Sequence, residues 1–345
     1  MYDVVEPNSN VQPPFLITWE STLKCNLDCS YCSSHDNSIP HPSLKECCDT
    51  LDFLYEYVDV YMNLKVEDQR HVSLNIFGGE SLFHPNIVEI LEYAIRKHKE
   101  GNYIWSLGIS TITNGIVKPK IWNDIIRYFD FLTVSHHAET TVEEKKLFKN
   151  NLLVLKEDNK NFQVSILKHP DYVQEYTEMI DWCEQHQIKY WARNLDGPRK
   201  ASQEQTITFV QKNNVLRNTP LGRSCCGGQT FNVNQNYETP ISFIDHNRFV
   251  DWHCSVNYFF VFVKQITQEV FVNKDCRMGY DGKYGPIGYL YNTDAILNEL
   301  KQRTVNKSVL PIICKKERCW CGLCTPKAKT ENLFNDIIGK YLLQE

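Results

Sequence analysis

The sequence predicts an α/β fold with a parallel sheet in its first part and a smaller, cysteine-rich unit in its second. From Phe15 to about Arg193, short apolar runs alternate with longer segments of helical periodicity, a pattern typical of βα units. After Asn194 the chain is rich in loops and short strands, and eight of its fourteen cysteines lie at or beyond Cys225. We therefore expect two architectural units with a boundary near residue 200.

Each element of the first unit has its own sequence signal. Six apolar runs are short enough to be buried strands: Phe15–Glu20, Val72–Phe77, Trp105–Ile112, Phe131–Ser135, Phe162–Lys168 and Lys189–Arg193. The periodic segments between them predict five helices: Ser43–Leu64, Asn86–Lys99, Lys118–Tyr128, Val142–Lys156 and Val173–Gln187. Prolines 85, 119 and 170 stand near helix starts, where a missing N–H has little effect.

The second unit gives weaker signals. Gly197-Pro198 and the stretch from Gln203 to Asn218 are interpreted as a polar connector and a linking helix. Further on, Tyr258–Gln265 and Glu269–Asn273 flank a Thr-Gln turn, which predicts a β-hairpin.

Composition limits the classes of function. With 42% hydrophobic and 23% charged residues, the 345-residue chain is typical of a globular protein. No stretch approaches the roughly 18 apolar residues that span a bilayer, and residues 1–14 do not resemble a signal peptide. We therefore expect a reducing cytoplasm, where cysteines are thiols or metal ligands. The net charge of −5 and the short, mixed basic runs do not favour nucleic acid as a partner.

The most informative motif is Cys25, Cys29 and Cys32, spaced C-x3-C-x2-C after the first expected strand. Three thiolates can hold three irons of a 4Fe–4S cube, which normally takes four cysteines. The fourth iron then has no protein ligand, and an open coordination position is typical of catalytic rather than structural metal sites. The alternatives are a zinc knuckle or three core cysteines.

This spacing, with the aromatic Tyr31 just before the last cysteine, resembles the signature of radical S-adenosylmethionine (SAM) enzymes. The resemblance implies a partial (β/α)6 TIM-like barrel over residues 14–200, after a short N-terminal segment 1–13. It also implies that SAM chelates the open iron and is cleaved to methionine and a 5′-deoxyadenosyl radical. Tyr31 resembles the aromatic that packs against the adenine.

Further candidate residues lie at the ends of the expected strands. Gly78, Gly79 and Glu80 follow the second strand, where the resemblance implies contacts to the methionine amine of SAM. The family often has proline next, whereas Ser81 follows here. The resemblance implies that Thr113, Asn114 and Ser135 contact the ribose or a carboxylate of SAM. Arg193, at the end of the sixth expected strand, is a candidate partner for a carboxylate of SAM or of the substrate. For Asn114 an Asn-Gly turn is an equal reading, and for Arg193 a structural ion pair. His136 and His137 invite a proton-transfer role, or are neutral histidines that close a strand.

The cysteines of the second unit resemble a SPASM/twitch extension, which holds auxiliary 4Fe–4S clusters. Cys254 and Cys276 flank the expected hairpin, and Cys314, Cys319, Cys321 and Cys324 form a dense group. The match to a full SPASM pattern is incomplete, so we expect one auxiliary cluster, best held by Cys254, Cys276, Cys319 and Cys321. Cys314 and Cys324 can replace one ligand or bind a second cluster, whereas Cys225 or Cys226 can bind a second cluster or face substrate. Structural zinc is the alternative, and Cys47, Cys48 and Cys183 are interpreted as ordinary helix thiols.

The sequence therefore predicts a radical SAM enzyme with an SPASM/twitch-like cluster domain over residues 201–345. Relatives of this kind often modify peptides or proteins, which makes a peptide the first expected substrate. A small molecule or sugar is the second, and RNA the third. A flavodoxin- or ferredoxin-like protein is the expected electron donor. A non-catalytic zinc scaffold would explain the C-terminal cysteines but not the Gly-Gly-Glu motif.

Overall fold

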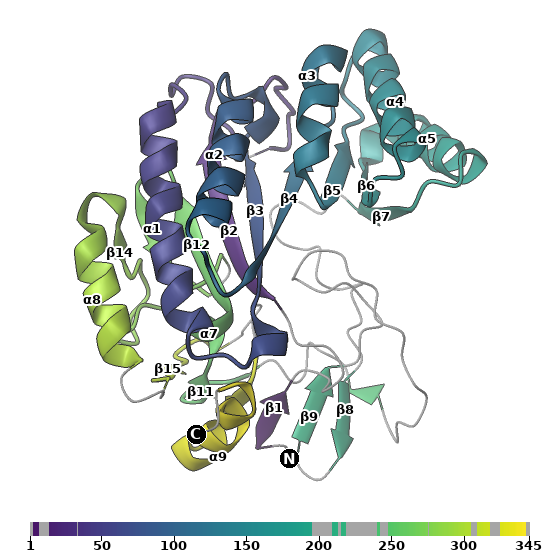
Figure 1. Ribbon diagram of the computed structural model, residues 1–345. Coiled ribbons are helices and arrows are strands. Elements are labelled where there is room, and N and C mark those ends of the chain that lie inside the picture. Colours follow the sequence, from purple (N-terminus) through teal and green to yellow (C-terminus); the bar gives the residue numbers. More distant parts are fainter. Residues whose placement is uncertain are drawn as a thin grey trace.

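The computed structural model describes residues 3–6, 14–32, 34–194, 209–212, 215–218, 240–241, 248–274, 276–304, 309–317 and 325–342 (Figure 1). Its larger sheet has nine strands in the order β14-β13-β12-β2-β3-β4-β5-β6-β7. Neighbours from β2 to β7 are parallel, as predicted. Their bounds are β2 Phe15–Thr22, β3 His71–Gly78, β4 Ser106–Thr113, β5 Phe131–His136, β6 Phe162–Lys168 and β7 Tyr190–Asn194. All six expected strands are confirmed.

The five expected helices are also present between these strands. They are α1 Leu44–Met62, α2 Ile87–Glu100, α3 Pro119–Ile125, α4 Val142–Glu157 and α5 Val173–Gln185. Two of them begin with a capping box, in which Ser43 pairs with Glu46 and Thr141 with Glu144. The third is shorter than expected, because its last turn continues as the 3-10 helix η3 Ile126–Tyr128.

The main core lies between the sheet and these helices. Phe15, Ile17 and Trp19 of β2 are fully buried, because alternate residues of a strand share a face and this face is covered by α1. The Phe15 ring packs on Tyr61 of α1 at a centroid distance of 5.6 Å. Burial of one such side chain stabilises the fold by about 2 kcal/mol. The opposite face of the sheet is the inner face of the partial barrel.

The expected hairpin extends this sheet. Strands β12 Phe260–Lys264 and β13 Glu269–Phe271 are antiparallel, and β12 pairs in parallel with β2. Strand β14 Gly288–Tyr289 completes that edge. The hairpin starts later than expected, because Tyr258 and Phe259 belong to the short helix α7 Val256–Phe259. Part of the second unit is therefore continuous with the barrel sheet.

The smaller sheet corrects one prediction. The expected linking helix from Gln203 to Asn218 is wrong over its described part, which forms β8 Phe209–Lys212 and β9 Val215–Asn218. These strands pair with each other, and β9 pairs in parallel with β1 Val4–Glu6 near the N-terminus. The pairing of β9 with β1 is long-range, and tertiary contacts of this kind override local helix propensity. The remaining strands are β10 Pro240–Ile241, β11 His253–Cys254, β15 Ile312–Ile313 and β16 Lys327–Ala328.

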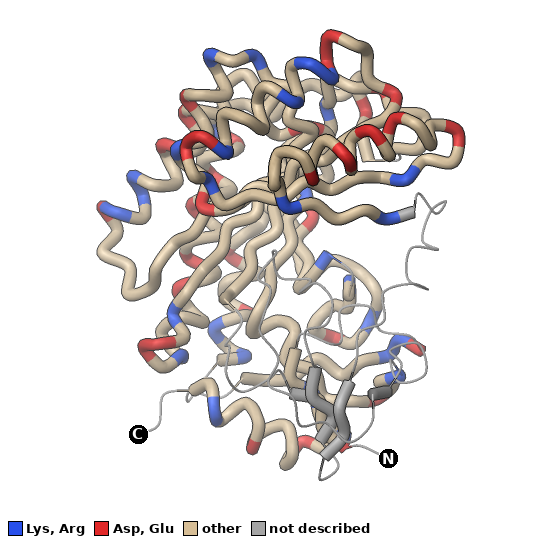
Figure 2. Tube along the Cα trace, turned by 90° about the vertical axis from the view of Figure 1, so that its right-hand side faces the viewer, with Lys and Arg blue, Asp and Glu red and all other residues tan. Residues whose placement is uncertain are grey.

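Short helices complete the described chain. They are α8 Thr293–Arg303 and α9 Glu331–Ile338, with the 3-10 turns η1 Glu67–Gln69, η2 Ser81–Phe83, η4 Pro170–Tyr172, η5 Leu290–Asn292 and η7 Gly339–Tyr341. Basic and acidic residues are intermixed along the chain (Figure 2). Among the helices that are described, none combines the length and the hydrophobicity that crossing a bilayer requires.

Candidate active site

The sequence motifs meet where the parallel strands end. The cysteine loop follows β2, the Gly-Gly-Glu motif ends β3, and Thr113-Asn114 ends β4. Ser135 and His137 lie at the end of β5. Because carboxyl ends of parallel strands share one edge, these four segments form one mouth of the partial barrel, which is where βα-barrel active sites lie.

The two glycines let the cysteine loop run directly against the end of β3. A Cβ on Gly78 would lie 2.1 Å from the Thr22 carbonyl oxygen, and one on Gly79 would lie 2.4 Å from that of Lys24. The Gly79 amide donates to Thr22 O at 2.9 Å, and the Glu80 amide donates to Lys24 O at 2.8 Å. Glycine is therefore required here by close packing of backbone on backbone, in addition to any ligand contact.

The Glu80 carboxyl group joins the ends of β3 and β4. It is 1% exposed, and its Oε1 accepts hydrogen bonds from the Leu82 amide and the Thr113 hydroxyl, both at 3.0 Å. Its Oε2 accepts from the Asn114 amide at 2.6 Å. Burial raises the pKa of Glu80 to about 7, against the lowering effect of these three donors. Thr113 and Asn114 are therefore held to Glu80 as well as placed at the mouth.

Glu80→Gln should remove a pH dependence from the stability of the cluster-free protein. The unfolded chain releases this proton near the usual pKa of 4.5, whereas the folded chain keeps it until about pH 7. The free energy of unfolding therefore falls as the pH rises through that window, by about 3 kcal/mol for this one group. Urea unfolding at pH 5 and pH 7.5 measures the effect. If the free energy of unfolding falls by the same amount between pH 5 and pH 7.5 in wild type and variant, Glu80 is not the source of the pH dependence.

Asn114 links the cysteine loop to β4. Its Nδ2 donates to Asn26 Oδ1 at 2.7 Å and lies 3.9 Å from Cys25 Sγ. Asn26 in turn donates from Nδ2 to the Ile116 carbonyl at 2.9 Å. Asn26, which is next to Cys25 in the chain, was not identified from the sequence, because a loop asparagine gives no periodic signal.

The three thiols suit a cluster with one thiolate for each iron. Cys25 is half-buried, Cys29 is buried and Cys32 is exposed, and the Cys32 amide donates to Cys29 O at 3.0 Å. Within the described ranges, no three His, Cys, Asp or Glu side chains converge on a position for one metal ion. A four-iron cube needs no such convergence, because each ligand binds its own iron. Burial raises the pKa of Cys25 and Cys29 to about 11, so iron binding must displace their protons.

Only one of the two histidines lies in this mouth. The ring of His137 stacks on Tyr31 with 6.1 Å between centroids, and the Tyr31 hydroxyl lies 2.6 Å from His137 Nδ1. His136 points to the other side of β5, where it is buried against Phe148, and burial lowers its pKa to about 3. His136 is therefore a neutral core residue. An adenine contact of Tyr31 stays a prediction.

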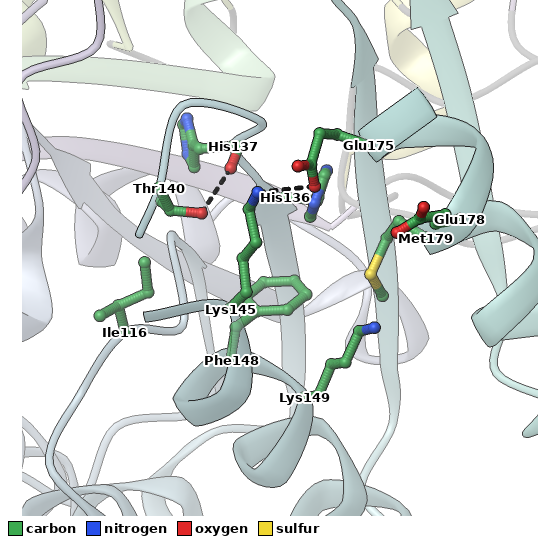
Figure 3. A pocket seen from close by; sticks show the side chains of 10 residues that line it. All are labelled: Ile116, His136, His137, Thr140, Lys145, Phe148, Lys149, Glu175, Glu178 and Met179. Atoms are coloured by element: carbon green, nitrogen blue, oxygen red, sulfur yellow. Dashed lines mark hydrogen bonds and ion pairs between the residues drawn. The ribbon is translucent and has the colours of Figure 1, made fainter. Parts of the chain in front are cut away.

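His136 and His137 both line a small pocket between α4 and α5 (Figure 3). Lys145 of α4 bridges to Glu175 of α5 at 2.6 Å across this pocket. The pocket also contains one further lysine and one further glutamate, Lys149 and Glu178. The charges of its two lysines and two glutamates balance.

Ser135 and Arg193 lie near the carboxyl ends of β5 and β7, farther along the mouth of the partial barrel. Ser135 is half-buried and pairs in register with Ser165 of β6. Arg193 is exposed near the end of β7, with its guanidinium 5.2 Å from the centre of the Trp191 ring. Their predicted contacts to ribose or carboxylate stay predictions.

Three of the predicted auxiliary ligands are described, and all three are buried: Cys254, Cys276 and Cys314. Strand β11, which contains Cys254, pairs with β15, and the Cys314 amide donates to Trp252 O at 3.0 Å. Cys254 Sγ lies 3.8 Å from the hydroxyl of Thr325, the residue after Cys324 in the chain. Cys225, Cys226, Cys319, Cys321 and Cys324 lie outside the described residues.

The other thiols match their interpretation as helix residues. Cys47 and Cys48 lie in α1 and Cys183 lies in α5. Cys47 and Cys183 are buried, and Cys48 is half-buried.

Comparison with known proteins agrees with this geometry. The radical SAM superfamily model matches residues 19–195, just over half of the 345 residues. Mycofactocin maturase MftC of Mycobacterium ulcerans is 31% identical over 111 residues, 31% of this chain and 25% of that protein. The antilisterial bacteriocin subtilosin biosynthesis protein AlbA of Bacillus subtilis is 29% identical over 122 residues, 34% of this chain and 23% of that protein. The matches thus span about a quarter of these relatives.

Two solved structures are similar at lower identity. Streptococcus suis SuiB has a TM-score of 0.44 at 13% identity, over 80% of this chain and 64% of that one. Hexahistidine-tagged anSMEcpe with bound AdoMet has a TM-score of 0.41 at 16% identity, over 54% of this chain and 52% of that one. The family match over residues 19–195 includes all three cysteines of the first motif and the Gly-Gly-Glu motif. The chain belongs to the radical SAM superfamily, whose members use a 4Fe–4S cluster and SAM.

Proposed function

We propose that this protein reductively cleaves SAM and uses the resulting radical to modify a peptide or protein. The proposal is carried by the hydrogen bonds around Glu80. These bonds connect the three-cysteine loop, the Gly-Gly-Glu motif and Asn114 at one mouth of the partial barrel. When bound, the reduced cluster supplies the electron that splits SAM into methionine and a 5′-deoxyadenosyl radical, which takes a hydrogen atom from the substrate.

The chain's own residues bind and orient in this proposal. Cys25, Cys29 and Cys32 hold the cluster, and the backbone of Gly78–Glu80 faces the methionine end of SAM. Because the Glu80 carboxyl group already accepts three hydrogen bonds, we assign it mainly to fixing this backbone. Asn114 and Ser135 are the ribose or carboxylate contacts on the rim.

A peptide substrate is supported by the relatives and is compatible with the inner face. One relative is named for biosynthesis of a bacteriocin and another as a maturase. On the inner face, Ile112 of β4 is 43% exposed, an apolar surface that a substrate side chain can contact. A small molecule or sugar is the second candidate. We further infer a reducing cytoplasm and a flavodoxin- or ferredoxin-like electron donor.

The proposal is tested by incubating the reconstituted protein with SAM and dithionite without oxygen. Formation of 5′-deoxyadenosine is expected, and its absence from cluster-loaded protein would overturn the proposal. Adding peptide mixtures or sugar mixtures separates the two substrate classes, because a substrate raises the rate of SAM cleavage above the uncoupled rate.

We also propose one auxiliary 4Fe–4S cluster held by Cys254, Cys276, Cys319 and Cys321. Cys254 and Cys276 are buried, as ligands of a protected cluster would be. Cys254 Sγ also lies 3.8 Å from the hydroxyl of Thr325, the first described residue after the C-terminal cysteine group. The cluster would relay an electron or anchor substrate.

Replacing Cys319 and Cys321 together by alanine should lower iron by about four atoms per chain. The SAM-sensitive spectrum of the first cluster should persist, because its ligands lie in a separate loop. Iron analysis and electron paramagnetic resonance measure both effects. Loss of zinc instead of iron would show that the C-terminal site is structural.

A further inference from the structure

The cysteine loop has a second attachment across the mouth, to Glu139. This residue follows β5, and its Oε2 accepts the Ser30 amide hydrogen at 2.7 Å. Its Oε1 accepts the hydroxyl hydrogen of the same serine. Ser30 lies between Cys29 and Cys32, so both bonds act on the middle of the motif. The Glu139 side chain is only 14% exposed, and hydrogen bonds to a carboxylate are roughly twice as strong as neutral ones.

His169, which follows β6, lies close to the same carboxylate. Its Nδ1 accepts the Asp171 amide hydrogen at 3.2 Å, so the ring proton lies on Nε2. That nitrogen is 3.7 Å from Glu139 Oε1, and the His169 side chain is 10% exposed. Glu139 therefore faces proton donors on two loops, one after β2 and one after β6. Three strands separate β2 from β6 in the sheet, so this contact depends on sheet curvature.

The neighbours of Ser30 are held from the same segment of chain. Cys29 Sγ lies 3.4 Å from His137 Nδ1, and the Tyr31 hydroxyl lies 2.6 Å from the same atom. His137 and Glu139 are two residues apart after β5. One short segment thus contacts three consecutive residues of the cysteine loop.

We propose that Glu139 is a positioning residue for an iron–sulfur cluster. Its two hydrogen bonds to Ser30 hold the loop so that the sulfur atoms of Cys29 and Cys32 point toward the cluster. The inference rests on the proposed function, since it needs a cluster to position. A loop that is ordered before binding loses less conformational entropy when the cluster is inserted. Glu139 acts through Ser30 and does not touch a cluster ligand in the described structure.

Glu139→Gln keeps the shape of the side chain but removes its charge and one acceptor. We expect iron to leave the reconstituted protein about 10- to 100-fold faster in the presence of EDTA, the range typical of residues that support metal ligands. Glu143→Gln is the matched control, because Glu143 is an exposed residue in the first turn of α4. The reduced cluster of Glu139→Gln should also give broader electron paramagnetic resonance lines with SAM, because the loop adopts more than one arrangement.

A double-mutant cycle separates positioning from general weakening of the fold. Ser30→Ala removes one of the two bonds and should accelerate iron loss less than Glu139→Gln. The double variant should be no faster than Glu139→Gln, because both changes remove the same contact. Additive effects, or a Glu139→Gln variant that matches Glu143→Gln in iron release and line shape, would overturn the inference alone. A wild-type protein that takes up no iron would overturn the proposed function and this inference with it.

Discussion

Cys25→Ala should abolish formation of 5′-deoxyadenosine and leave the protein folded. The thiol lies at the mouth, only half-buried, so its removal should cost about 1 kcal/mol of stability. The cluster needs all three thiolates, because each binds one iron. Chromatography of anaerobic reactions and thermal unfolding followed by circular dichroism measure the two effects.

Cys48→Ala is the matched control for this experiment. Cys48 is also half-buried, but it lies in α1 outside the mouth, so activity and iron content should stay at wild-type levels. If Cys25→Ala still cleaves SAM, the proposed site is wrong. If it merely unfolds and wild type binds zinc, the scaffold hypothesis is the better one.

Gly79→Ala should both destabilise the protein and loosen the cysteine loop. The new Cβ would lie 2.4 Å from Lys24 O and 2.5 Å from Leu23 O, and both neighbours are backbone atoms. Forcing the two segments apart should cost about 1–3 kcal/mol and break the amide bonds from Gly79 and Glu80. Urea unfolding gives the loss of stability, and iron release to EDTA gives the effect on the loop.

Gly285→Ala provides the matched control, because a Cβ at Gly285 meets nothing within 4 Å. We expect this variant to be as stable as wild type or up to about 1 kcal/mol more stable, since alanine restricts the unfolded chain. Equal behaviour of the two alanine variants would contradict the close packing described for Gly79.

The barrel could be predicted because its signals are local. The strands β3 and β6 are short apolar runs, and the starts of α1 and α4 coincide with the capping residues Ser43 and Thr141. The smaller sheet was not predicted, because β9 joins it by pairing with β1, which lies near the N-terminus and far from β9 in sequence. Local propensity carries no information about such a partner.

The same distinction applies to the site. The cysteine and Gly-Gly-Glu motifs were predicted because each is compact in sequence and follows a strand. The hydrogen bonds that attach the loop were not predicted, because their partners are far apart in sequence. Asn26 and Asn114 are separated by 88 residues, and Ser30 and Glu139 by 109. Their positions after β4 and β5 are the one signal that points to them, since polar residues at strand ends line a barrel mouth. A proton-transfer role was left open for both His136 and His137, and only His137 contacts the cysteine loop, because adjacent strand residues face opposite sides.

The most direct test of the central claim is the iron and sulfide content per chain after anaerobic reconstitution. Two four-iron clusters predict about eight irons and about eight sulfides, and the Cys25→Ala, Cys29→Ala, Cys32→Ala triple variant should retain about four of each. Wild-type protein that binds no iron after competent reconstitution would contradict the account.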